Sequence, residues 1–326
     1  MKEIIIAILS LVFGFVLLIK GADYFVDGAS SIAKKLHIPS IIIGLTIVAF
    51  GTSAPELAVS ITAALKESND IAVGNVVGSN IFNTLVVLGT SAAITPVVVQ
   101  KSIIKHDYPI SIFITALLGI FCLDRVFGKE NMEISRIDGI ILLICFAGFM
   151  AFILWEGLKN RDSSENTDEN GKAKPFWLTV ILGVIGLAAI IIGGDLTVEG
   201  AKDIAQKLGL SDALIGLTVV ALGTSLPELV TSIVAARKGE SDIAVGNVVG
   251  SNIFNILLIL GTSATIFPMT VSTTYIYDIG ILLAISVIFF IPIAIRKRVD
   301  RWLGIIMVLT YLLYTTYLIL RQLQII

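Results

Sequence analysis

Charged residues are scarce in this sequence. Asp, Glu, Lys and Arg together make up 15% of its 326 residues, whereas about a quarter is usual for a soluble domain. Hydrophobic residues make up 56%, and the mean hydropathy is +0.95. This composition excludes an ordinary soluble protein and predicts an integral membrane protein. With a net charge of −2, no nucleic-acid partner is expected.

Cysteine and histidine are also rare, with two of each. Cys122 and Cys145 lie in apolar surroundings and lack the spacing of metal ligands, so a disulfide framework or a thiolate metal site is not expected. We interpret both as core or lipid-facing residues. His37 and His106 lie at the edges of predicted spans, which leaves the candidate site described below without histidine.

Long apolar stretches are what the sequence has in abundance. A helix crosses the bilayer core with about 20 apolar residues. The first and the sixth stretches are longer than one crossing needs, and we expect long tilted helices there. The ten predicted spans are residues 3–35, 40–65, 71–97, 106–123, 137–156, 176–207, 212–236, 243–266, 275–295 and 302–321.

The segment DIAVGNVVGSNIFN occurs twice, from Asp70 to Asn83 and from Asp242 to Asn255. This identity indicates an internal duplication, and we interpret the leading aspartate of each copy as a helix N-cap. Each half holds five predicted spans, an odd number, so the second copy would cross the membrane in the opposite sense. The sequence therefore predicts an all-α membrane protein of ten transmembrane helices in two inverted five-helix repeats, a plan common among secondary transporters.

A charged segment rich in Asn and Ser, from Glu156 to Pro175, predicts a flexible linker between the halves. Lys and Arg are more numerous in the loops that face the cytoplasm if the N-terminus lies outside. We therefore expect a multi-pass protein of the cell membrane with both termini outside and the linker in the cytoplasm. The expected units are a first repeat, 1–156, a linker, 157–175, and a second repeat, 176–326.

Two short motifs place a carboxylate deep in a predicted span. AFGTSAPE ends at Glu56, and ALGTSLPE ends at Glu228. A carboxylate at the bilayer centre costs about 3 kcal/mol even on the mildest scales. One interpretation is a capping box, in which Ser53 and Ser225 cap the helices that carry the glutamates.

The prolines of these motifs indicate more than a cap. Pro55 and Pro227 lack an N–H and disturb the preceding turn, so we expect free carbonyl oxygens there, including those of Ala49 and Ala221. Free backbone oxygens at membrane depth occur only inside protein or beside a polar cavity. With the Thr and Ser hydroxyls and the glutamate, each motif offers only oxygen ligands, and we favour a binding role in addition to capping.

The repeated segment adds a polar stripe to each half. Asn75, Ser79 and Asn83 are spaced four residues apart and share one helix face, and the second copy repeats the stripe from Asn247. The glycines of GNVVG fit close helix packing, and packing explains the first asparagine of each stripe as well as binding does. The residues that we expect to face the glutamate motif across a short helical hairpin are Ser79, Asn83, Ser251 and Asn255.

The ligand class follows from this inventory. Carboxylate, hydroxyl, amide and carbonyl oxygens suit Na⁺, Ca²⁺ or Mg²⁺ rather than soft transition metals. Two carboxylates balance one Ca²⁺ or two Na⁺. Because Ca²⁺ tolerates irregular oxygen cages and Mg²⁺ does not, broken helices favour Ca²⁺ over Mg²⁺.

The paired motifs, GTSAPE and GTSLPE, each followed by GNVVGSNIFN, resemble the repeats of the sodium/calcium exchanger family in the cation/calcium antiporter superfamily. The resemblance covers most of both halves. It implies ten helices in two inverted repeats with the ions held among four central helices, and first and sixth helices that slide to switch access. The site residues that it implies are Glu56 and Glu228 for Ca²⁺, Thr52, Ser53, Ser79, Thr224, Ser225, Ser251 and the carbonyls of Ala49 and Ala221 for Na⁺, and Asn83 and Asn255 at the remaining polar positions.

The function that we expect is antiport of Na⁺ for Ca²⁺ by alternating access, in a monomer that is not an enzyme and uses no cofactor beyond the transported ions. One departure concerns Asn255, where potassium-dependent relatives carry Asp; this departure weakens the expectation of potassium dependence.

Three alternatives remain. A Ca²⁺/H⁺ antiporter would load protons on Glu56 and Glu228. An intramembrane hydrolase would use Ser53 or Ser225, but a serine nucleophile needs a base that the motifs lack. A passive Ca²⁺ channel usually carries its acids in a ring around a symmetric pore.

Overall fold

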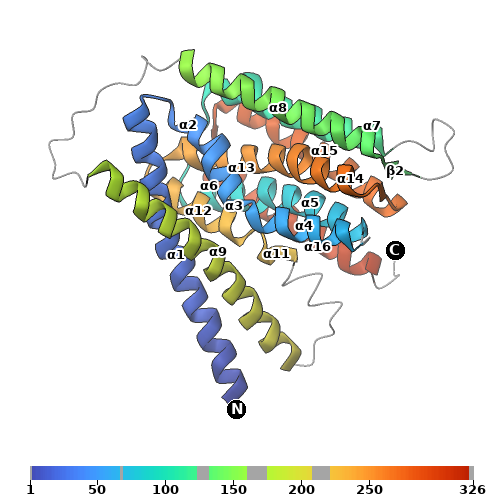
Figure 1. Ribbon diagram of the computed structural model, residues 1–326, viewed down its shortest axis with the longest axis horizontal. Helices are drawn as coiled ribbons and strands as arrows, with labels where there is room; N and C mark the ends of the chain where they lie inside the picture. Colours follow the sequence, from blue (N-terminus) through green and yellow to red (C-terminus); the bar gives the residue numbers. More distant parts are fainter. Residues whose placement is uncertain (1, 67–68, 123–131, 160–174, 208–220, 323–326) are drawn as a thin grey trace.

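The computed structural model describes residues 2–66, 69–122, 132–159, 175–207 and 221–322. Within these ranges, eight helices are long and apolar enough to cross a membrane. A ninth candidate is a pair of helices, Ser40–Thr52 and Ala54–Leu65, bent by 49° at the break between them. The chain is therefore a multi-pass, mostly helical membrane protein (Figure 1). The first part of the expected span 212–236, up to residue 220, and most of the expected linker fall outside the described residues.

The first half begins with α1, the longest of its helices, and ends with α8. Its helices are α1 (Lys2–Leu36), α2 (Ser40–Ile43), α3 (Ala49–Thr52), α4 (Ala54–Leu65), α5 (Asn69–Phe82), α6 (Leu88–Ile94), α7 (Tyr108–Phe121) and α8 (Arg136–Lys159). Three short π-helical turns continue them: η1 (Gly44–Val48), η2 (Asn83–Val87) and η3 (Ile103–Asp107).

The second half follows a similar order. Its helices are α9 (Phe176–Lys207), α11 (Ala221–Gly223), α12 (Leu226–Arg237), α13 (Ser241–Phe254), the π-helical η7 (Asn255–Leu260), α14 (Gly261–Ile266), α15 (Thr273–Arg296) and α16 (Arg301–Gln322). The predicted sixth span, 176–207, is confirmed residue for residue.

Two very short antiparallel strand pairs each join one strand from either half. β1 (Val97–Val98) pairs with β4 (Arg298–Val299), and β2 (Glu133–Ile134) pairs with β3 (Met269–Thr270).

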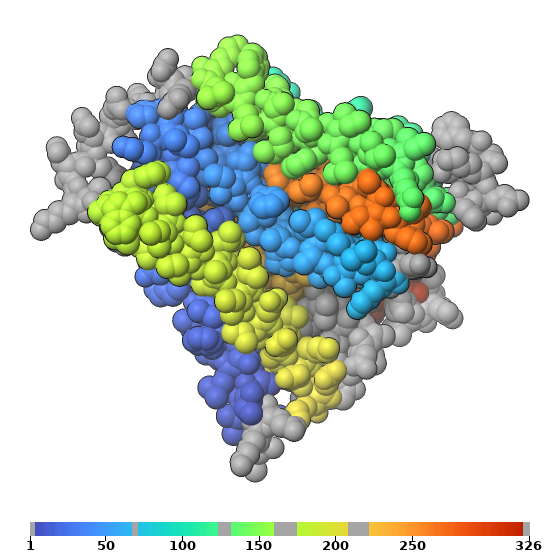
Figure 2. Space-filling model, viewed as in Figure 1, coloured from blue at the N-terminus to red at the C-terminus, as the bar shows by residue number. Residues whose placement is uncertain are grey.

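The long helices α1 and α9 cross each other, and one end of the pair extends away from the other helices (Figures 1 and 2). They have 35 and 32 residues, as expected of helices longer than one crossing. Glycines line their contact: a Cβ built at Gly186 would lie 2.6 Å from the carbonyl oxygen of Gly21. Small residues let helix backbones approach closely in a membrane, where apolar burial does not drive association.

The centre of the molecule contains the two hairpins α4–α5 and α12–α13. Apart from Ser241 and Asp242, which are half-buried, every residue of α13 is buried. The leading aspartate of the second copy, Asp242, lies in the first turn of α13, and Glu240 is the N-cap. The prediction that Asp242 caps this helix is therefore wrong; the cap lies two residues earlier. Asp70 is outside what is described at side-chain level.

Candidate ion-binding site

A helix break places a glutamate at the same point in each half. α4 starts after Ser53 (φ −83°, ψ 7°), and α12 starts after Ser225 (φ −91°, ψ 6°). The proline beside each start tolerates a first helical turn because its missing N–H would have no partner there. Glu56 and Glu228 lie in these first turns, and neither exposes any surface to solvent.

Glu228 is bound by a serine from the other half of the chain. The Ser53 hydroxyl donates to Glu228 Oε1 at 2.8 Å, and Ser53 Oγ lies 3.0 Å from Ser251 Oγ. Ser251 Oγ is also 3.4 Å from Glu228 Oε1. The broken helix of the first half thus completes the surroundings of the carboxylate of the second half.

Glu56 has the reciprocal arrangement. The Ser225 hydroxyl donates to Glu56 Oε1 at 3.0 Å, and Ser225 Oγ lies 3.0 Å from Ser79 Oγ. All three side chains are buried. Each half therefore contributes a serine to the glutamate of the other half, and neither half alone supplies all the contacts of its own glutamate.

Two predictions about these motifs are wrong. Neither Ser53 nor Ser225 makes a side-chain capping bond, so the capping box does not form; each serine turns to the opposite carboxylate instead. The Ala49 carbonyl is not free, because it accepts the Ser53 N–H at 3.0 Å. The prediction for the Ala221 carbonyl stays untested.

Beside each glutamate, an asparagine joins the two helices of the hairpin through hydrogen bonds. Asn247 Nδ2 donates to the Glu228 carbonyl at 3.4 Å and to Ser232 Oγ at 3.0 Å, while Thr52 Oγ1 lies 3.0 Å from Asn247 Oδ1. This asparagine is fully buried. Its bonds join α12, α13 and α3, so its role is to hold the glutamate backbone in place.

Asn75 makes the equivalent bonds in the first half. It donates to the Glu56 carbonyl at 3.3 Å and to Ser60 Oγ at 3.0 Å, and the Thr224 hydroxyl donates to Asn75 Oδ1 at 3.4 Å. Thr52 and Thr224 therefore each support the asparagine of the opposite half.

The last residue of each polar stripe starts a π-helical turn. Asn83 begins η2 and Asn255 begins η7, and both side chains are fully buried. Asn255 Nδ2 donates to Asn80 Oδ1 at 2.9 Å. Neither polar atom of the Asn83 side chain has a partner within the described part of the chain. π-turns occur often at functional sites, but the sequence carried no local signal for these two.

Each glutamate keeps one oxygen without a partner. Oε2 of Glu56 and Oε2 of Glu228 are buried and accept no hydrogen bond from any described residue. In addition, no three His, Cys, Asp or Glu side chains of the described ranges come together as metal ligands. The site therefore offers two carboxylates, four serine hydroxyls and nearby amides, which is a donor set for a hard cation.

A family model described as sodium/calcium exchanger protein matches residues 6–155 and 178–320. The chain belongs to the sodium/calcium exchanger family. It is 38% identical to the putative antiporter CaxA of Alkalimonas amylolytica, over 95% of this chain and 98% of that protein. It is 36% identical to the sodium/calcium exchanger MaX1 of Methanosarcina acetivorans, over 95% of this chain and 97% of that protein.

Solved structures give the same result. A structure of the sodium-calcium exchanger NCX_Mj soaked with Na⁺ and Sr²⁺ matches with a TM-score of 0.81 at 32% identity, covering 96% of this chain and 98% of that chain. The prediction of the family from the paired motifs is therefore confirmed, and the chain belongs to a family of ion exchangers.

In this exchanger-family chain, the structure brings together most of the residues that the sequence singled out. The four serines and two glutamates form two hydrogen-bonded groups. One consists of Ser53, Glu228 and Ser251, and the other consists of Ser225, Glu56 and Ser79. Sequence reasoning missed Asn80 and Asn252, which belong to the repeated segment but stand outside the predicted stripe. Asn80 Nδ2 donates to the Asn252 carbonyl at 3.1 Å, and Asn252 Nδ2 donates to Thr84 Oγ1 at 3.0 Å. These bonds join α5 and η2 to α13 behind the site.

Proposed function

We propose that this chain is an antiporter that exchanges Na⁺ for Ca²⁺ across the cell membrane by alternating access. The observation that carries the proposal is the reciprocal pairing of serines and glutamates between halves. It buries two carboxylates inside a membrane protein, where an unpaired charge is costly. A divalent cation between the halves balances both charges, and two Na⁺ balance them equally.

The role of each residue follows from its contacts. Oε2 of Glu56 and Oε2 of Glu228 are the oxygens free to bind Ca²⁺. The serine hydroxyls that hold the Oε1 atoms are the ligands that Na⁺ would share. We propose further contributions to ion binding from Asn83 and Asn255, from Thr52 and Thr224 acting through Asn247 and Asn75, and from the carbonyls of Ala49 and Ala221.

The architecture that we propose has ten spans in two inverted repeats, 1–156 and 176–326, with both termini outside and the linker 157–175 in the cytoplasm. Equivalent contacts support the repeat. A Cβ built at Gly14 would lie 2.7 Å from the Gly193 carbonyl oxygen, and one built at Gly21 would lie 2.7 Å from that of Gly186. Exchanging the halves turns one contact into the other. We propose that a monomer performs the exchange and that no cofactor takes part.

The driving ion is tested by ⁴⁵Ca²⁺ uptake into proteoliposomes. An outward Na⁺ gradient is expected to drive uptake, and a pH gradient alone is not. A second candidate is Ca²⁺/H⁺ antiport, favoured by the unpartnered Oε2 atoms, which could hold protons. Uptake driven only by the pH gradient would establish that candidate and reject Na⁺/Ca²⁺ exchange. Uptake without Na⁺ or a pH gradient would indicate a channel.

The carboxylates are tested by Glu56→Gln and Glu228→Gln. Each variant keeps the size of the side chain and removes one of two charges, so Na⁺-driven Ca²⁺ uptake should fall at least a hundredfold. Glu199→Gln is the matched control, because Glu199 is exposed on α9. Normal uptake by either site variant, with the same amount of folded protein, would show that its carboxylate does not bind Ca²⁺.

A further inference from the structure

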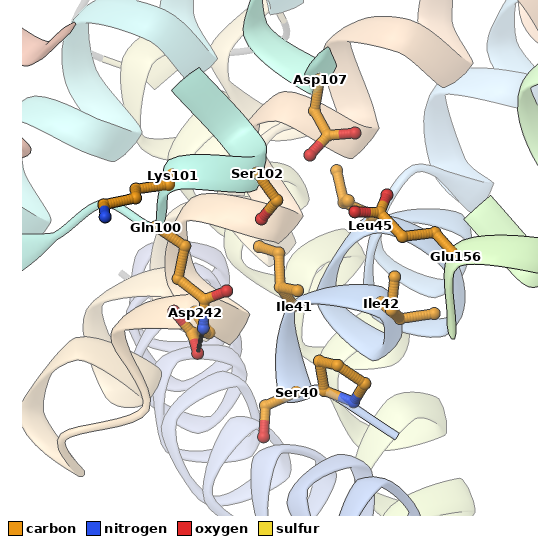
Figure 3. Close-up of a pocket in the computed structure, with 11 residues that line it drawn as sticks. Ser40, Ile41, Ile42, Leu45, Gln100, Lys101, Ser102, Asp107, Glu156 and Asp242 are labelled. Atoms are coloured by element: carbon orange, nitrogen blue, oxygen red, sulfur yellow. Dashed lines mark hydrogen bonds between the residues drawn. The ribbon is translucent and has the colours of Figure 1, made fainter. Parts of the chain in front are cut away.

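An acidic cavity lies away from the candidate site, beside α2 and the start of α13 (Figure 3). Its volume is about 550 Å³. No residue of the candidate ion-binding site lines it. The polar side chains that line it are Asp107, Glu156, Asp242, Lys101, Ser40, Ser102 and Gln100.

Asp107 has no partner for one of its oxygens. Its side chain is only 1% exposed, and Oδ1 is buried with no hydrogen bond from the residues that the structure describes. Ser102 Oγ, on the same cavity, is buried and unpartnered as well. Figure 3 shows the carboxylates of Asp107 and Glu156 directed toward the same space. A buried carboxylate without a partner is costly, and a bound cation would remove that cost.

The other charged residues of the cavity do not supply that cation. Asp242 accepts a hydrogen bond from Gln100 Nε2. The ammonium of Lys101 points away from Asp107 (Figure 3).

The second half of the chain shows what occupies the equivalent place. Asp278 on α15 is 3% exposed, and Arg321 on α16 donates two hydrogen bonds to it, each 3.0 Å long. Paired N–H groups on one carboxylate are among the strongest hydrogen bonds in proteins. The buried aspartate of this half is therefore neutralised by a guanidinium.

Glu156 stands where the second half has Arg321. The segments RIDGII (Arg136–Ile141) and RWLGII (Arg301–Ile306) open α8 and α16 in the same register. Continuing that register without a gap aligns Glu156 with Arg321.

Packing supports this alignment. A Cβ built at Gly139 would meet the Gly261 carbonyl oxygen at 2.8 Å, and one built at Gly304 would meet that of Gly89. Gly89 and Gly261 are themselves equivalent positions of the internal repeat. The same contact between the halves thus forms twice, with α8 of the first half on α14 of the second, and α16 of the second half on α6 of the first.

Asp107 is the counterpart of Asp278. The short strands β1 and β3 precede the two aspartates at equivalent positions of the repeat. The first half then contains the π-helical turn Ile103–Asp107, and the second half contains a regular helix. A π-turn accommodates one extra residue, which brings the first aspartate to the position of the second. The ion pair of one half is therefore matched by two carboxylates in the other.

We propose that this cavity binds a hydrated divalent cation of the Ca²⁺ type between Asp107 and Glu156, in the place that the Arg321 guanidinium occupies in the second half. Two carboxylates and the Ser102 hydroxyl supply hard oxygen ligands. The volume far exceeds that of a bare ion, so water completes the coordination. With few protein ligands, the expected Kd is on the order of 10⁻⁴ to 10⁻³ M.

The test uses the full chain in detergent with Glu56→Gln and Glu228→Gln, so that failure of the proposed transport site cannot be confused with failure of this one. Calorimetric titration with CaCl₂ should still show one bound ion. Adding Asp107→Asn or Glu156→Gln should weaken binding at least tenfold. Asp27→Asn is the control, because Asp27 is an exposed carboxylate paired with Lys238.

Glu156→Arg provides the decisive comparison. It should reproduce the pair of the second half, abolish Ca²⁺ binding in this cavity and remove the rise of Tm with Ca²⁺. If the doubly substituted background fails to fold, the wild-type chain should bind one more Ca²⁺ than the Glu156→Arg variant. The proposal is overturned if the background binds no Ca²⁺, if Asp107→Asn leaves the Kd unchanged, or if Asp27→Asn weakens binding as much.

Discussion

The exchange of serines between the halves can be measured as a coupling energy. The structure places Ser53 Oγ at 2.8 Å from Glu228 Oε1, although the two residues are far apart in sequence. Glu56, only three residues after Ser53, receives no hydrogen bond from it; the Ser225 hydroxyl donates to that carboxylate instead. A double-mutant cycle should therefore show coupling of Ser53→Ala with Glu228→Ala and none with Glu56→Ala.

The size of the coupling follows from the chemistry of the bond. Side-chain hydrogen bonds between membrane helices average about 0.6 kcal/mol in such cycles and reach about 1.7 kcal/mol. A short bond to a carboxylate belongs in the upper part of that range. We expect about 1 to 1.7 kcal/mol for Ser53 with Glu228, and a similar or smaller value for Ser225 with Glu56, whose bond is 3.0 Å.

The assay is the free energy of unfolding in mixed micelles titrated with lithium dodecyl sulfate, without Na⁺ or Ca²⁺, so that only contacts within the protein contribute. Truncation effects that each variant causes alone cancel in the cycle. A larger coupling of Ser53 with Glu56 than with Glu228 would support the capping box and refute the hydrogen bond from Ser53 to the glutamate of the other half.

Two further predictions concern packing and charge. Gly186→Leu places a side chain against the Gly21 carbonyl oxygen, where a Cβ alone would lie 2.6 Å away. It should destabilise the α1–α9 pair by about 1 to 3 kcal/mol in the same dodecyl sulfate titration. Gly148→Leu should not, because a Cβ built at Gly148 has no atom within 4 Å. Arg321→Gln leaves the buried Asp278 without its partner and should lower the free energy of unfolding by about 3 kcal/mol in the same assay. Adding Asp278→Asn should restore part of that stability. An unchanged stability of Arg321→Gln would show that the pair contributes nothing.

Hydropathy predicted the long helices well because each of them carries its own signal. The sequence placed spans at 176–207 and 275–295, and the structure has helices at Phe176–Lys207 and Thr273–Arg296. The helix breaks were equally local, since a proline in an apolar span interrupts the backbone ladder wherever the chain goes afterwards.

Contacts between the halves could not be predicted in this way. Ser53 and Glu56 have the spacing of a capping box, and nothing nearby indicates that the serine points to Glu228 instead. The pairing depends on how two distant hairpins pack, which the spacing of neighbours does not encode. Asp107 and Glu156 were missed for a similar reason, because each reads as an ordinary residue near the end of a span until it is aligned with the ion pair of the other half.

The reciprocal contacts also bear on why exchange would be obligatory under the proposed function. Each glutamate has one oxygen held by the opposite half and one oxygen free, so a cation that binds both free oxygens bridges the same two hairpins that the serines already join. Moving one hairpin against the other then changes the surroundings of both carboxylates at once. An empty site would have to bring two negative charges through this movement without a counter-ion, at a cost of several kcal/mol. A bound Ca²⁺ or pair of Na⁺ removes that cost, because a ligand shifts a conformational equilibrium by its difference in affinity for the two states.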